Sequence, residues 1–408
     1  MDASARRLRF PDGVTLILIA TAVAGGCGYV ANLLVGGSRP AAEYAVFGVF
    51  WSALYLIIAA LSGIQQEVTR ASHLRRESDP PSLNPVRNFG IVAGIVVGIA
   101  VLGSGLLWGA AVFPEPSFPL VFPIAAGGAS YVIVAVLAGS LYGVSAWRPI
   151  AVLMVVDGVL RLMSVVVVIA IGGGTNALAW AVALPFPLSV ILVWWYARRF
   201  IVGRVVLDVG LGTLVRNVLS TVVASVATGV LISGFPLVMR LTSPAEPAAS
   251  IGALIFAVNL IRAPLVIVVL SLQSYLVVRF RNAPADAKRV FVSLSLLIVG
   301  AATVASLAAW FVVPPILAAV PGDYGLNGWV IAGLVATSGL LGVLCVSGPL
   351  ALARAQHHVY TAGWVSAALA SIVVMIINVD LSSRVVLALA VGPSIGVAVH
   401  LIGISRRR

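Results

Sequence analysis

Long apolar runs, separated by short polar segments, fill almost the whole chain. Each run is about 20 residues long or more, the length that a helix needs to cross the hydrocarbon core of a bilayer. No polar segment between them is long enough to form a domain of its own. This pattern predicts an all-α polytopic membrane protein of about twelve transmembrane helices. The runs are Val14–Gly36, Tyr44–Ile64, Gly90–Phe113, Pro119–Gly143, Ile150–Gly172, Leu178–Tyr196, Val218–Val238, Ile251–Leu272, Val290–Val313, Trp329–Leu352, Thr361–Val379 and Val385–Ile404.

The runs divide the chain into two halves of six helices. Gly139–Arg148 lies between the fourth and fifth runs, and Gly348–His357, which shares Gly, Leu and Ala with it, lies 209 residues later between the tenth and eleventh. We therefore predict an N-lobe of residues 1–203 with helices 1–6 and a C-lobe of residues 204–408 with helices 7–12. Halves with an even number of helices run in the same direction, and parallel repeats place a substrate site at their interface. The second and eighth helices are expected to continue past their runs, toward Thr69 and Phe280.

Basic residues predict the orientation of the helices. With the N-terminus inside, twenty of the 25 fall in cytoplasmic segments, including the long connector Thr69–Asn88. Three fall in outer loops (Arg39, Arg240 and Arg384), and two lie within the membrane. Cytoplasmic loops of membrane proteins carry such an excess of arginine. We therefore expect a multi-pass protein of the cytoplasmic membrane with both termini in the cytoplasm.

Composition agrees with a membrane protein and excludes several functions. The chain is 61% hydrophobic and 9% charged, with a mean hydropathy of +1.12, whereas soluble domains carry about 25% charged residues. The net charge of +12 does not indicate nucleic-acid binding, because the arginines lie at the ends of apolar runs and form no basic face. Lys288 is the only lysine, and its surroundings do not form a nucleotide-binding P-loop.

No catalytic or metal-binding pattern is visible. The four histidines lack metal-ligand spacing, and the two cysteines, Cys27 and Cys345, lie inside apolar runs and indicate no disulfide framework. We therefore expect no enzyme activity, no metal and no cofactor. Transport is the function that a chain rich in spans and without an outer domain favours.

Ionisable groups inside the membrane are costly and often functional. Arg262 lies 11 residues into the eighth run, about 16 Å deep at about 1.5 Å per residue and so near the midplane. Asn259 lies one turn earlier, and Pro264 removes a backbone donor and should kink the helix, which leaves polar backbone that needs a wet or polar environment. A guanidinium at this depth can bind phosphate oxygens with two hydrogen bonds. The alternative is an arginine satisfied by carbonyls or by a carboxylate between helices.

Asp157 and Arg161 are a second intramembrane group, four residues apart in the fifth run. This spacing places them on one helical face, where they can neutralise each other as a structural pair. The alternative is that Asp157 couples transport to a proton or ion when a substrate engages Arg161.

Polar residues also mark the helix ends. The cytoplasmic end of the second helix carries a candidate gate, for which interfacial polarity is the alternative, at Gln65, Gln66, Glu67 and Arg70. At the outer ends, Arg39 with Glu43 and Arg240 with Glu246 are candidate gate pairs, for which loop solvation is the alternative. Asn32 lies late in the first run and is a further candidate for substrate binding.

The first hairpin carries a resemblance to a known family. Gly28–Gly37, followed by Glu43–Ser52 with its Glu-Tyr-x-x-Phe opening and by Gln65–Arg70, resembles the first helix pair of polysaccharide flippases of the O-antigen type. These belong to the multidrug/oligosaccharidyl-lipid/polysaccharide (MOP) exporter superfamily. The resemblance implies two lobes in a V, with a cavity lined by the first, second, seventh and eighth helices. It implies flipping of an isoprenoid-(pyro)phosphate-linked saccharide to the outer leaflet by alternating access.

Under this resemblance Arg262 would contact the phosphate, with Asn259, Arg161 and Asn32 as further binding residues. Members that flip the peptidoglycan precursor carry charges in the first helix, whereas Val14–Gly36 has none, so another lipid-linked sugar is favoured. Membrane lipids and polysaccharide polymerases or glycosyltransferases are the expected partners, and nucleic acid is not. The alternatives are a multidrug or small-molecule exporter of the same superfamily, and a scaffold or polytopic glycosyltransferase.

Overall fold

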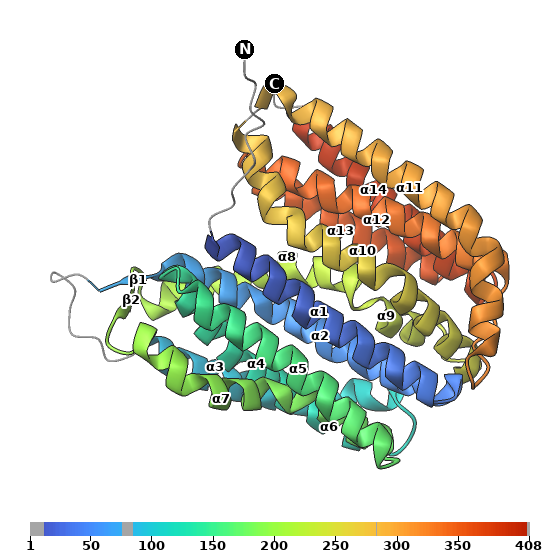
Figure 1. Cartoon of the computed structure of the whole chain (residues 1–408), viewed down its shortest axis with the longest axis horizontal. Coiled ribbons are helices and arrows are strands. Elements are labelled where there is room, and N and C mark those ends of the chain that lie inside the picture. Colours follow the sequence, from blue (N-terminus) through green and yellow to red (C-terminus); the bar gives the residue numbers. More distant parts are fainter. Residues whose placement is uncertain (1–11, 76–84, 283, 406–408) are drawn as a thin grey trace.

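The computed structural model describes residues 12–75, 85–282 and 284–405, and these form fourteen helices and two short strands (Figure 1). The helices are α1 (Asp12–Ser38), α2 (Ala41–Ala71), α3 (Pro85–Val112), α4 (Phe118–Gly143), α5 (Trp147–Ala170), α6 (Thr175–Ala183), α7 (Pro185–Ile201), α8 (Leu211–Ile232), α9 (Phe235–Thr242), α10 (Ala248–Asn282), α11 (Pro284–Ala319), α12 (Gly328–Ala353), α13 (His357–Met375) and α14 (Leu381–Ser405). The strands are β1 (Ser72–Leu74) and β2 (Val205–Leu207).

These helices confirm the predicted all-α polytopic architecture. Among the described residues, eleven segments are long and apolar enough to cross a membrane, with α6 and α7 together counted as one of them. A further apolar helical stretch, Ala248–Pro264, belongs to the long helix α10 and corresponds to the predicted eighth span. Helices α2 and α10 continue to Ala71 and Asn282, past the ends of their apolar runs, as predicted.

Two predicted spans are each built from two helices. The sixth is interrupted at Leu184, and α7 begins at Pro185. The seventh is interrupted at Ser233 and Gly234, and α9 has Pro236 in its first turn. Proline lacks an amide proton and fits the first turn of a helix but not its interior. The run of apolar residues continues across both breaks, so hydropathy alone predicts single helices there.

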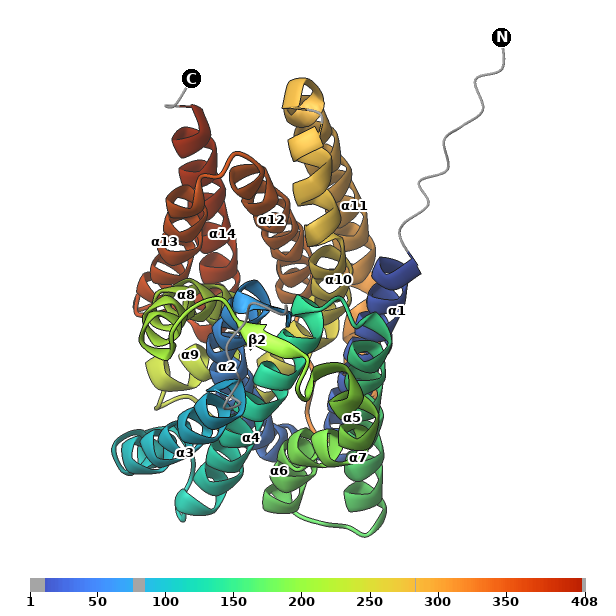
Figure 2. The same cartoon turned by 90° about the vertical axis from the view of Figure 1, so that its left-hand side faces the viewer.

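The helices group into two bundles, here called the first lobe (α1–α7) and the second lobe (α8–α14). In the first lobe α1 packs on α5, and α2 and α3 pack on α4; in the second, α11 packs on α12 and α13 on α14. Helices α1 and α2 meet α8, α9 and α10 between the lobes. The lobes converge at the end opposite the termini and splay apart at the end where α1 begins and α14 ends (Figures 1 and 2). The exact boundary between residues 203 and 204 stays a prediction.

The junctions between α4 and α5 and between α12 and α13 repeat one another. Ser145 and Ala355 both have a positive φ, of 55° and 56°, and each amide donates to a carbonyl of the preceding helix, Tyr142 and Leu352. Both bounds of α12 lie 210 residues after those of α4. Matching the sequence letters placed the two junctions 209 residues apart, whereas the structure places them 210 residues apart.

The strands close the connection between the lobes. β1 pairs antiparallel with β2, with Ser72 opposite Leu207, and the Asp208 amide donates to the carbonyl of Ala71 at 2.9 Å. The end of α2 is thus tied to the segment that leads into α8. Part of the predicted connector, residues 76–84, and the terminal arginines at positions 6, 7, 9 and 406–408 lie outside the described residues.

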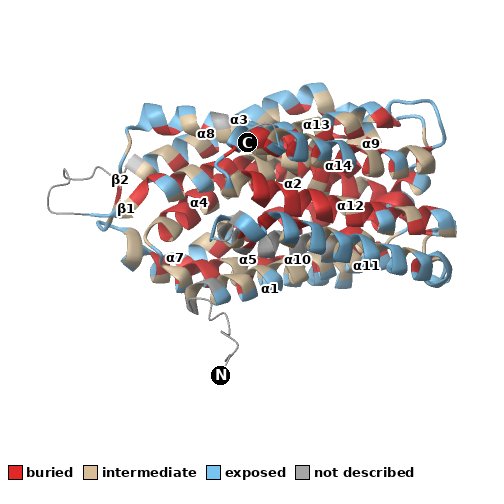
Figure 3. Cartoon of the chain, turned by 90° about the horizontal axis from the view of Figure 1, so that it is seen from above, coloured by how far each residue is buried: buried red, intermediate tan, exposed pale blue. Residues whose placement is uncertain are grey.

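Apolar side chains point outward as well as inward (Figure 3). The buried positions concentrate on α2, α4 and α12, whereas much of α3 and α11 is exposed. On α11, Leu297 and Phe311 are 67% and 76% exposed. Exposed apolar faces of this extent indicate contact with lipid.

Candidate functional site

A cavity of about 380 Å³ lies between the lobes near the middle of the membrane-spanning helices. It is lined by α1, α2, α8, α9 and α10, the set that the resemblance implies, and by α5 in addition. Helix α1 contributes mainly small residues, which leave room for a ligand. The lining includes Thr21, Ala24, Gly25, Gly28, Tyr29, Asn32, Trp51, Ser52, Tyr55, Arg161, Pro236, Asn259 and Arg262.

Arg262 is a cation of this cavity for which the described residues supply no counter-ion. Its side chain lines the cavity and is only 5% exposed. One terminal nitrogen, Nη2, donates to the carbonyl of Leu231 at 3.2 Å, and the buried Nε has no partner among the described residues. None of the ion pairs among the described residues includes it. A buried charge without a counter-ion costs several kcal/mol, so this position is expected to be functional.

The break in the seventh span explains the free carbonyl that Arg262 uses. Helix α8 ends at Ile232, so its last carbonyls have no partner inside the helix. Leu231 lies in this last turn and accepts from Arg262. The Ser52 hydroxyl of α2 donates to the carbonyl of Ser233 at 2.7 Å and accepts from the Leu237 amide at 3.1 Å. One serine of the first lobe thus bridges the interruption in the second.

The carbonyl freed by Pro264 also has a partner from the first lobe. In a continuous helix the carbonyl of Leu260 would accept from the amide four residues later, and Pro264 has no amide proton. The hydroxyl of Tyr29 on α1 donates to this carbonyl at 3.0 Å. A tyrosine of the first lobe therefore supplies a polar group to the backbone that Pro264 frees.

Asn32 and Asn259, two residues singled out in the sequence, meet between the lobes. Both contact Tyr44, which the sequence analysis missed. The Tyr44 hydroxyl donates to Asn32 Oδ1, and Asn259 Nδ2 lies 3.2 Å from the Tyr44 hydroxyl and 3.5 Å from Asn32 Oδ1. Asn259 is on α10, whereas its partners are on α1 and α2. This cluster is a hydrogen-bonded contact that holds the two lobes together beside the cavity.

Arg161 is buried and compensated, in contrast to Arg262. Its Nη2 lies 2.6 Å from Asp157 Oδ2, as the spacing of four residues predicts. Its Nε donates to the carbonyl of Val182 at 3.4 Å, and its guanidinium carbon lies 4.7 Å from the centre of the Phe186 ring. The other oxygen of Asp157 is buried without a partner. The pair is therefore held in the first lobe, with Arg161 lining the cavity.

The residues of the candidate gate at the end of α2 contact different parts of the molecule. Glu67 accepts from Arg70 Nε at 3.0 Å and from the Thr221 hydroxyl of α8 at 3.1 Å, which joins the two lobes. Gln66 lines a second cavity next to the first. The carbonyl of Gln65 lies instead against Gly139 of α4.

At the opposite end the lobes meet through the backbone. The Ala41 amide donates to the carbonyl of Gly322 at 2.7 Å, and the Tyr324 hydroxyl donates to the carbonyl of Arg39 at 2.9 Å. Gly322 has a φ of 109°, and a Cβ there would lie 2.6 Å from Pro40 Cα. Burial, and less strongly the nearby carboxylate of Glu43, raises the pKa of Tyr324. The tyrosine therefore remains a hydrogen-bond donor at neutral pH.

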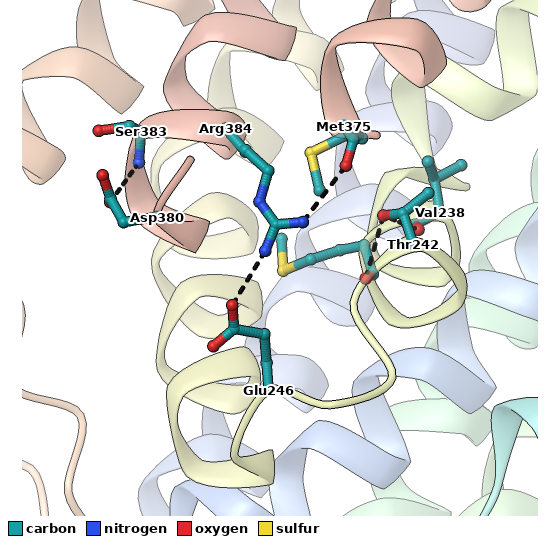
Figure 4. A network of polar contacts seen from close by, with 8 residues as sticks. Val238, Thr242, Glu246, Met375, Asp380, Ser383 and Arg384 are labelled. Carbon is teal, nitrogen blue, oxygen red and sulfur yellow. Dashed lines mark hydrogen bonds and ion pairs between the residues drawn. The ribbon is translucent and has the colours of Figure 1, made fainter. Parts of the chain in front are cut away.

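Of the two candidate outer gate pairs, Arg39 with Glu43 forms in the structure and Arg240 with Glu246 does not. Glu43 lies 3.7 Å from Arg39 on the same hairpin, and Arg39 also donates to the carbonyl of Gly173 within the first lobe. Pairing of Glu246 with Arg240 is wrong, because Glu246 forms its ion pair with Arg384 at 2.9 Å (Figure 4).

Arg240 and Asp380 instead form hydrogen bonds at the ends of helices. Arg240 donates to the carbonyl of Val112 at 3.3 Å. Asp380 caps α14 by accepting from the Ser383 amide at 2.9 Å, which lowers the pKa of Asp380 (Figure 4).

Comparison with known sequences finds relatives over almost the whole chain. No protein-family model matches the sequence. The chain is 31% identical over 392 residues to the uncharacterized protein Rv1510 of Mycobacterium tuberculosis strain H37Rv, covering 95% of this chain and 90% of that protein. The same identity and coverage hold for the uncharacterized proteins Mb3654 of Mycobacterium bovis and Rv3630 of Mycobacterium tuberculosis.

Solved structures show the fold. An inward-facing multidrug resistance transporter of the MATE family in the MOP superfamily matches with a TM-score of 0.66 at 12% identity, over 95% of this chain and 94% of that one. An outward-facing multidrug resistance transporter of the MATE family matches with a TM-score of 0.63 at 14% identity, over 97% of this chain and 95% of that one. A MOP superfamily transporter from Pyrococcus furiosus, described as having a binding pocket of reverse polarity, matches with a TM-score of 0.61 at 14% identity, over 96% of this chain and 95% of that one. The chain therefore has the MOP fold.

Proposed function

This chain belongs to the protein family of the mycobacterial proteins Rv1510, Mb3654 and Rv3630, and we propose that it is a flippase with the MOP transporter fold. Its substrate is an isoprenoid-(pyro)phosphate-linked saccharide, moved from the inner to the outer leaflet of the cytoplasmic membrane for cell-envelope polysaccharide synthesis. The observation that carries the proposal is Arg262, a buried cation on the wall of the cavity between the lobes that has no counter-ion in the described part of the chain.

The charge of the cavity favours an anionic ligand. Arg161 and Arg262 both line it, and Asp157 compensates only the first of them. A phosphate can accept two hydrogen bonds from one guanidinium, and it supplies the missing counter-charge. A cationic drug would meet repulsion at the same place. Asn259 and Asn32 offer amide groups beside the phosphate, although Tyr44 uses part of their capacity.

The arrangement of the lobes suits loading from the inner leaflet. If the termini are cytoplasmic, as the basic residues predict, the splayed end of the molecule faces the cytoplasm (Figure 2). Alternating access would then require two changes. The backbone hydrogen bond between Ala41 and Gly322 would break at the end where the lobes now meet. At the splayed end, the lobes would come together beside the contact between Glu67 and Thr221.

Asp157 is our candidate for energy coupling. A phosphate that takes one of the hydrogen bonds of Arg161 would weaken its 2.6 Å pair with Asp157. The released carboxylate, in a buried place, would then take up a proton. In the cell, glycosyltransferases would supply the substrate and a polysaccharide polymerase would consume it.

The decisive experiment replaces Arg262 in a strain that lacks the chain. Arg262→Ala is expected to reduce translocation of the lipid-linked saccharide at least about tenfold, because a charged hydrogen bond to phosphate contributes about 1.5–3 kcal/mol. Arg262→Lys should retain part of the activity. The control is Arg148→Ala, an exposed arginine at the start of α5. Unchanged translocation with Arg262→Ala would refute the role of this residue.

The fold also allows a multidrug or small-molecule exporter of the same superfamily. That function predicts drug susceptibility in the deletion strain together with normal envelope polysaccharide. The uncompensated charge of Arg262 favours the flippase.

A further inference from the structure

A second cavity, of about 330 Å³, adjoins the first and lies between α2, α8 and α13. The two cavities share Tyr55, Ile232 and Ser233 in their walls. Each has the size of a small-molecule binding site, which spans about 300–1,000 Å³. The two cavities are therefore adjacent, with these three residues in the wall of both.

The two cavities differ in chemistry. The first is lined by two arginines, whereas the described side chains that line the second carry no formal charge. Its polar groups are hydroxyls and one amide, supplied by Ser62, Gln66, Thr221, Ser225, Thr228 and Ser233. Four of the six are on or directly after α8, and the other two are on α2.

Several of these groups are available to a ligand. Within the described part of the chain, no hydrogen bond is formed by the side chains of Gln66 and Ser225. The hydroxyl proton of Ser62 is used by the carbonyl of Ala59 at 2.6 Å, and the single hydroxyl proton of Thr221 is shared between the carbonyl of Asn217, at 2.9 Å, and the carboxylate of Glu67, at 3.1 Å. Their oxygens can still accept, because each hydroxyl has two lone pairs. The cavity thus offers both donors and acceptors.

Aromatic rings complete the lining. Tyr55 stacks on Trp51 with ring centres 4.8 Å apart, and Tyr360 of α13 contributes to the wall from the second lobe. Neighbouring hydroxyl, amide and aromatic groups match a sugar, which has hydroxyls at its edge and C–H groups on its faces. The carboxylate of Glu67, the residue after Gln66 on α2, is engaged by Arg70 and Thr221.

We propose that the second cavity binds the saccharide of the substrate, and that it selects an uncharged sugar next to the phosphate held by Arg262. This inference rests on the proposed function, because it divides one ligand between two adjoining cavities. A carboxylate-bearing sugar is disfavoured, since the described lining of the cavity includes no cation to replace the water that the carboxylate would lose.

The test measures binding of defined probes to the purified full-length protein. The probes are farnesyl diphosphate, farnesyl diphosphoglucose and farnesyl diphosphoglucuronate. We expect the glucose probe to bind more tightly than the glucuronate probe. In the double variant Gln66→Leu with Ser225→Ala, affinity for the glucose probe should fall about tenfold, through the loss of two hydrogen bonds. Affinity for farnesyl diphosphate should stay within about twofold of the parent protein.

The control is Ser394→Ala, which removes an exposed hydroxyl on α14 that is bonded to the carbonyl of Ala390. It should leave affinity for all three probes unchanged. An equal loss for the glucose probe and farnesyl diphosphate, or no loss for either, would overturn the sugar site. Failure of the proposed function gives a different result: Arg262→Ala would leave the affinity for all three probes unchanged.

A second measurement does not depend on the stability of the double variant. A single cysteine is introduced as Ser225→Cys, with Cys27→Ser and Cys345→Ser to remove the native thiols. The glucose probe should slow its reaction with a maleimide at least about fivefold, whereas farnesyl diphosphate should not, because occupancy of the site blocks the thiol. Equal protection by both probes, or protection by neither, would contradict a sugar in this cavity.

Discussion

Two arginines of the described residues are buried inside the spans, and only one of them has a carboxylate partner among these residues. Arg161 has Asp157 at 2.6 Å, a carbonyl and the face of Phe186. Arg262 has one carbonyl and a buried Nε without a partner. A buried ion pair can be retained for structure, but an uncompensated cation lowers stability. The contrast supports a structural contribution from Arg161 in the resting state and a ligand-binding role for Arg262.

Breaking the pair of Asp157 and Arg161 should destabilise the first lobe. Asp157→Leu and Arg161→Met each leave one buried charge alone, which should lower the free energy of unfolding by about 3–5 kcal/mol. The double variant should recover much of this loss. Thermal unfolding in detergent measures the effect, with Glu43→Gln as a control, because its exposed pair with Arg39 contributes at most about 1 kcal/mol. Additive losses in the double variant would contradict the pairing.

At the residue scale, the sequence correctly predicted the pairing of Asp157 with Arg161, whereas the binding and coupling roles of these residues and of Arg262 stay predictions. Arg262, Asp157 and Arg161 are conspicuous in apolar runs, and the spacing of the last two determines that they pair. Tyr44 was not found, because a tyrosine near a helix end is ordinary until Asn32 and Asn259 are brought to it from other helices. Likewise, no charge pattern links Glu246 with Arg384, which lie 138 residues apart.

Helix interruptions are the main feature at the scale of elements, because each frees carbonyls that another helix then satisfies. The break after Ile232 is bridged by Ser52 of α2, and Pro264 of α10 leaves a carbonyl to Tyr29 of α1. These contacts run from one lobe to the other. They can therefore be exchanged when the lobes move, at the cost of a few hydrogen bonds.

Replacing Pro264 should make the hydrogen bond from Tyr29 unnecessary for stability. Tyr29→Phe should lower stability by about 1 kcal/mol, because the carbonyl of Leu260 loses its donor. In the background of Pro264→Ala the new amide satisfies that carbonyl, so Tyr29→Phe should have almost no effect. Thermal unfolding of the four proteins forms a double-mutant cycle. Equal effects in both backgrounds would show that the hydrogen bond to the helix carbonyl contributes nothing.

Hydropathy predicted the spans well, because lipid selects for apolar length and little else. It did not predict the breaks at Leu184 and Ser233, since an apolar run continues across them. The predicted offset between the two halves was one residue too short, because the two junctions share their backbone geometry and not their residue types. Ser145 and Ala355 share a left-handed conformation but not a residue type, so matching letters misaligned the two junctions.

On the scale of the whole molecule, the two lobes are in direct contact at one end through glycines. A Cβ at Gly252 of α10 would overlap the carbonyl oxygen of Ala41 at the start of α2. A Cβ at Gly36 would meet the ring of Phe256. Closure at this end therefore depends on positions where only a hydrogen fits, and these positions mark where the lobes must separate during transport.

Gly252→Ala should open this end of the molecule. The overlap is with backbone, so no rotamer change can relieve it, and the hydrogen bond between Ala41 and Gly322 should break. Spin labels at Ala42 and Pro321, both exposed, should move apart in a double electron–electron resonance measurement. The control is Gly37→Ala, because a Cβ at Gly37 has open space around it. An unchanged distance would show that the lobes close without this contact.

The direction of transport depends on which end of the molecule faces the cytoplasm, and helix α10 allows a direct test. Ala245 precedes this helix and Asn282 ends it, and both are exposed. With Cys27→Ser and Cys345→Ser, we expect a membrane-impermeant maleimide to label Ala245→Cys in intact cells and Asn282→Cys only after permeabilisation, because the excess of arginine keeps the end of α10 inside. The reverse pattern would place the splayed end outside the cell. The cavity would then load from the outer leaflet, and flipping from the inner leaflet would have to begin from a conformation other than this one.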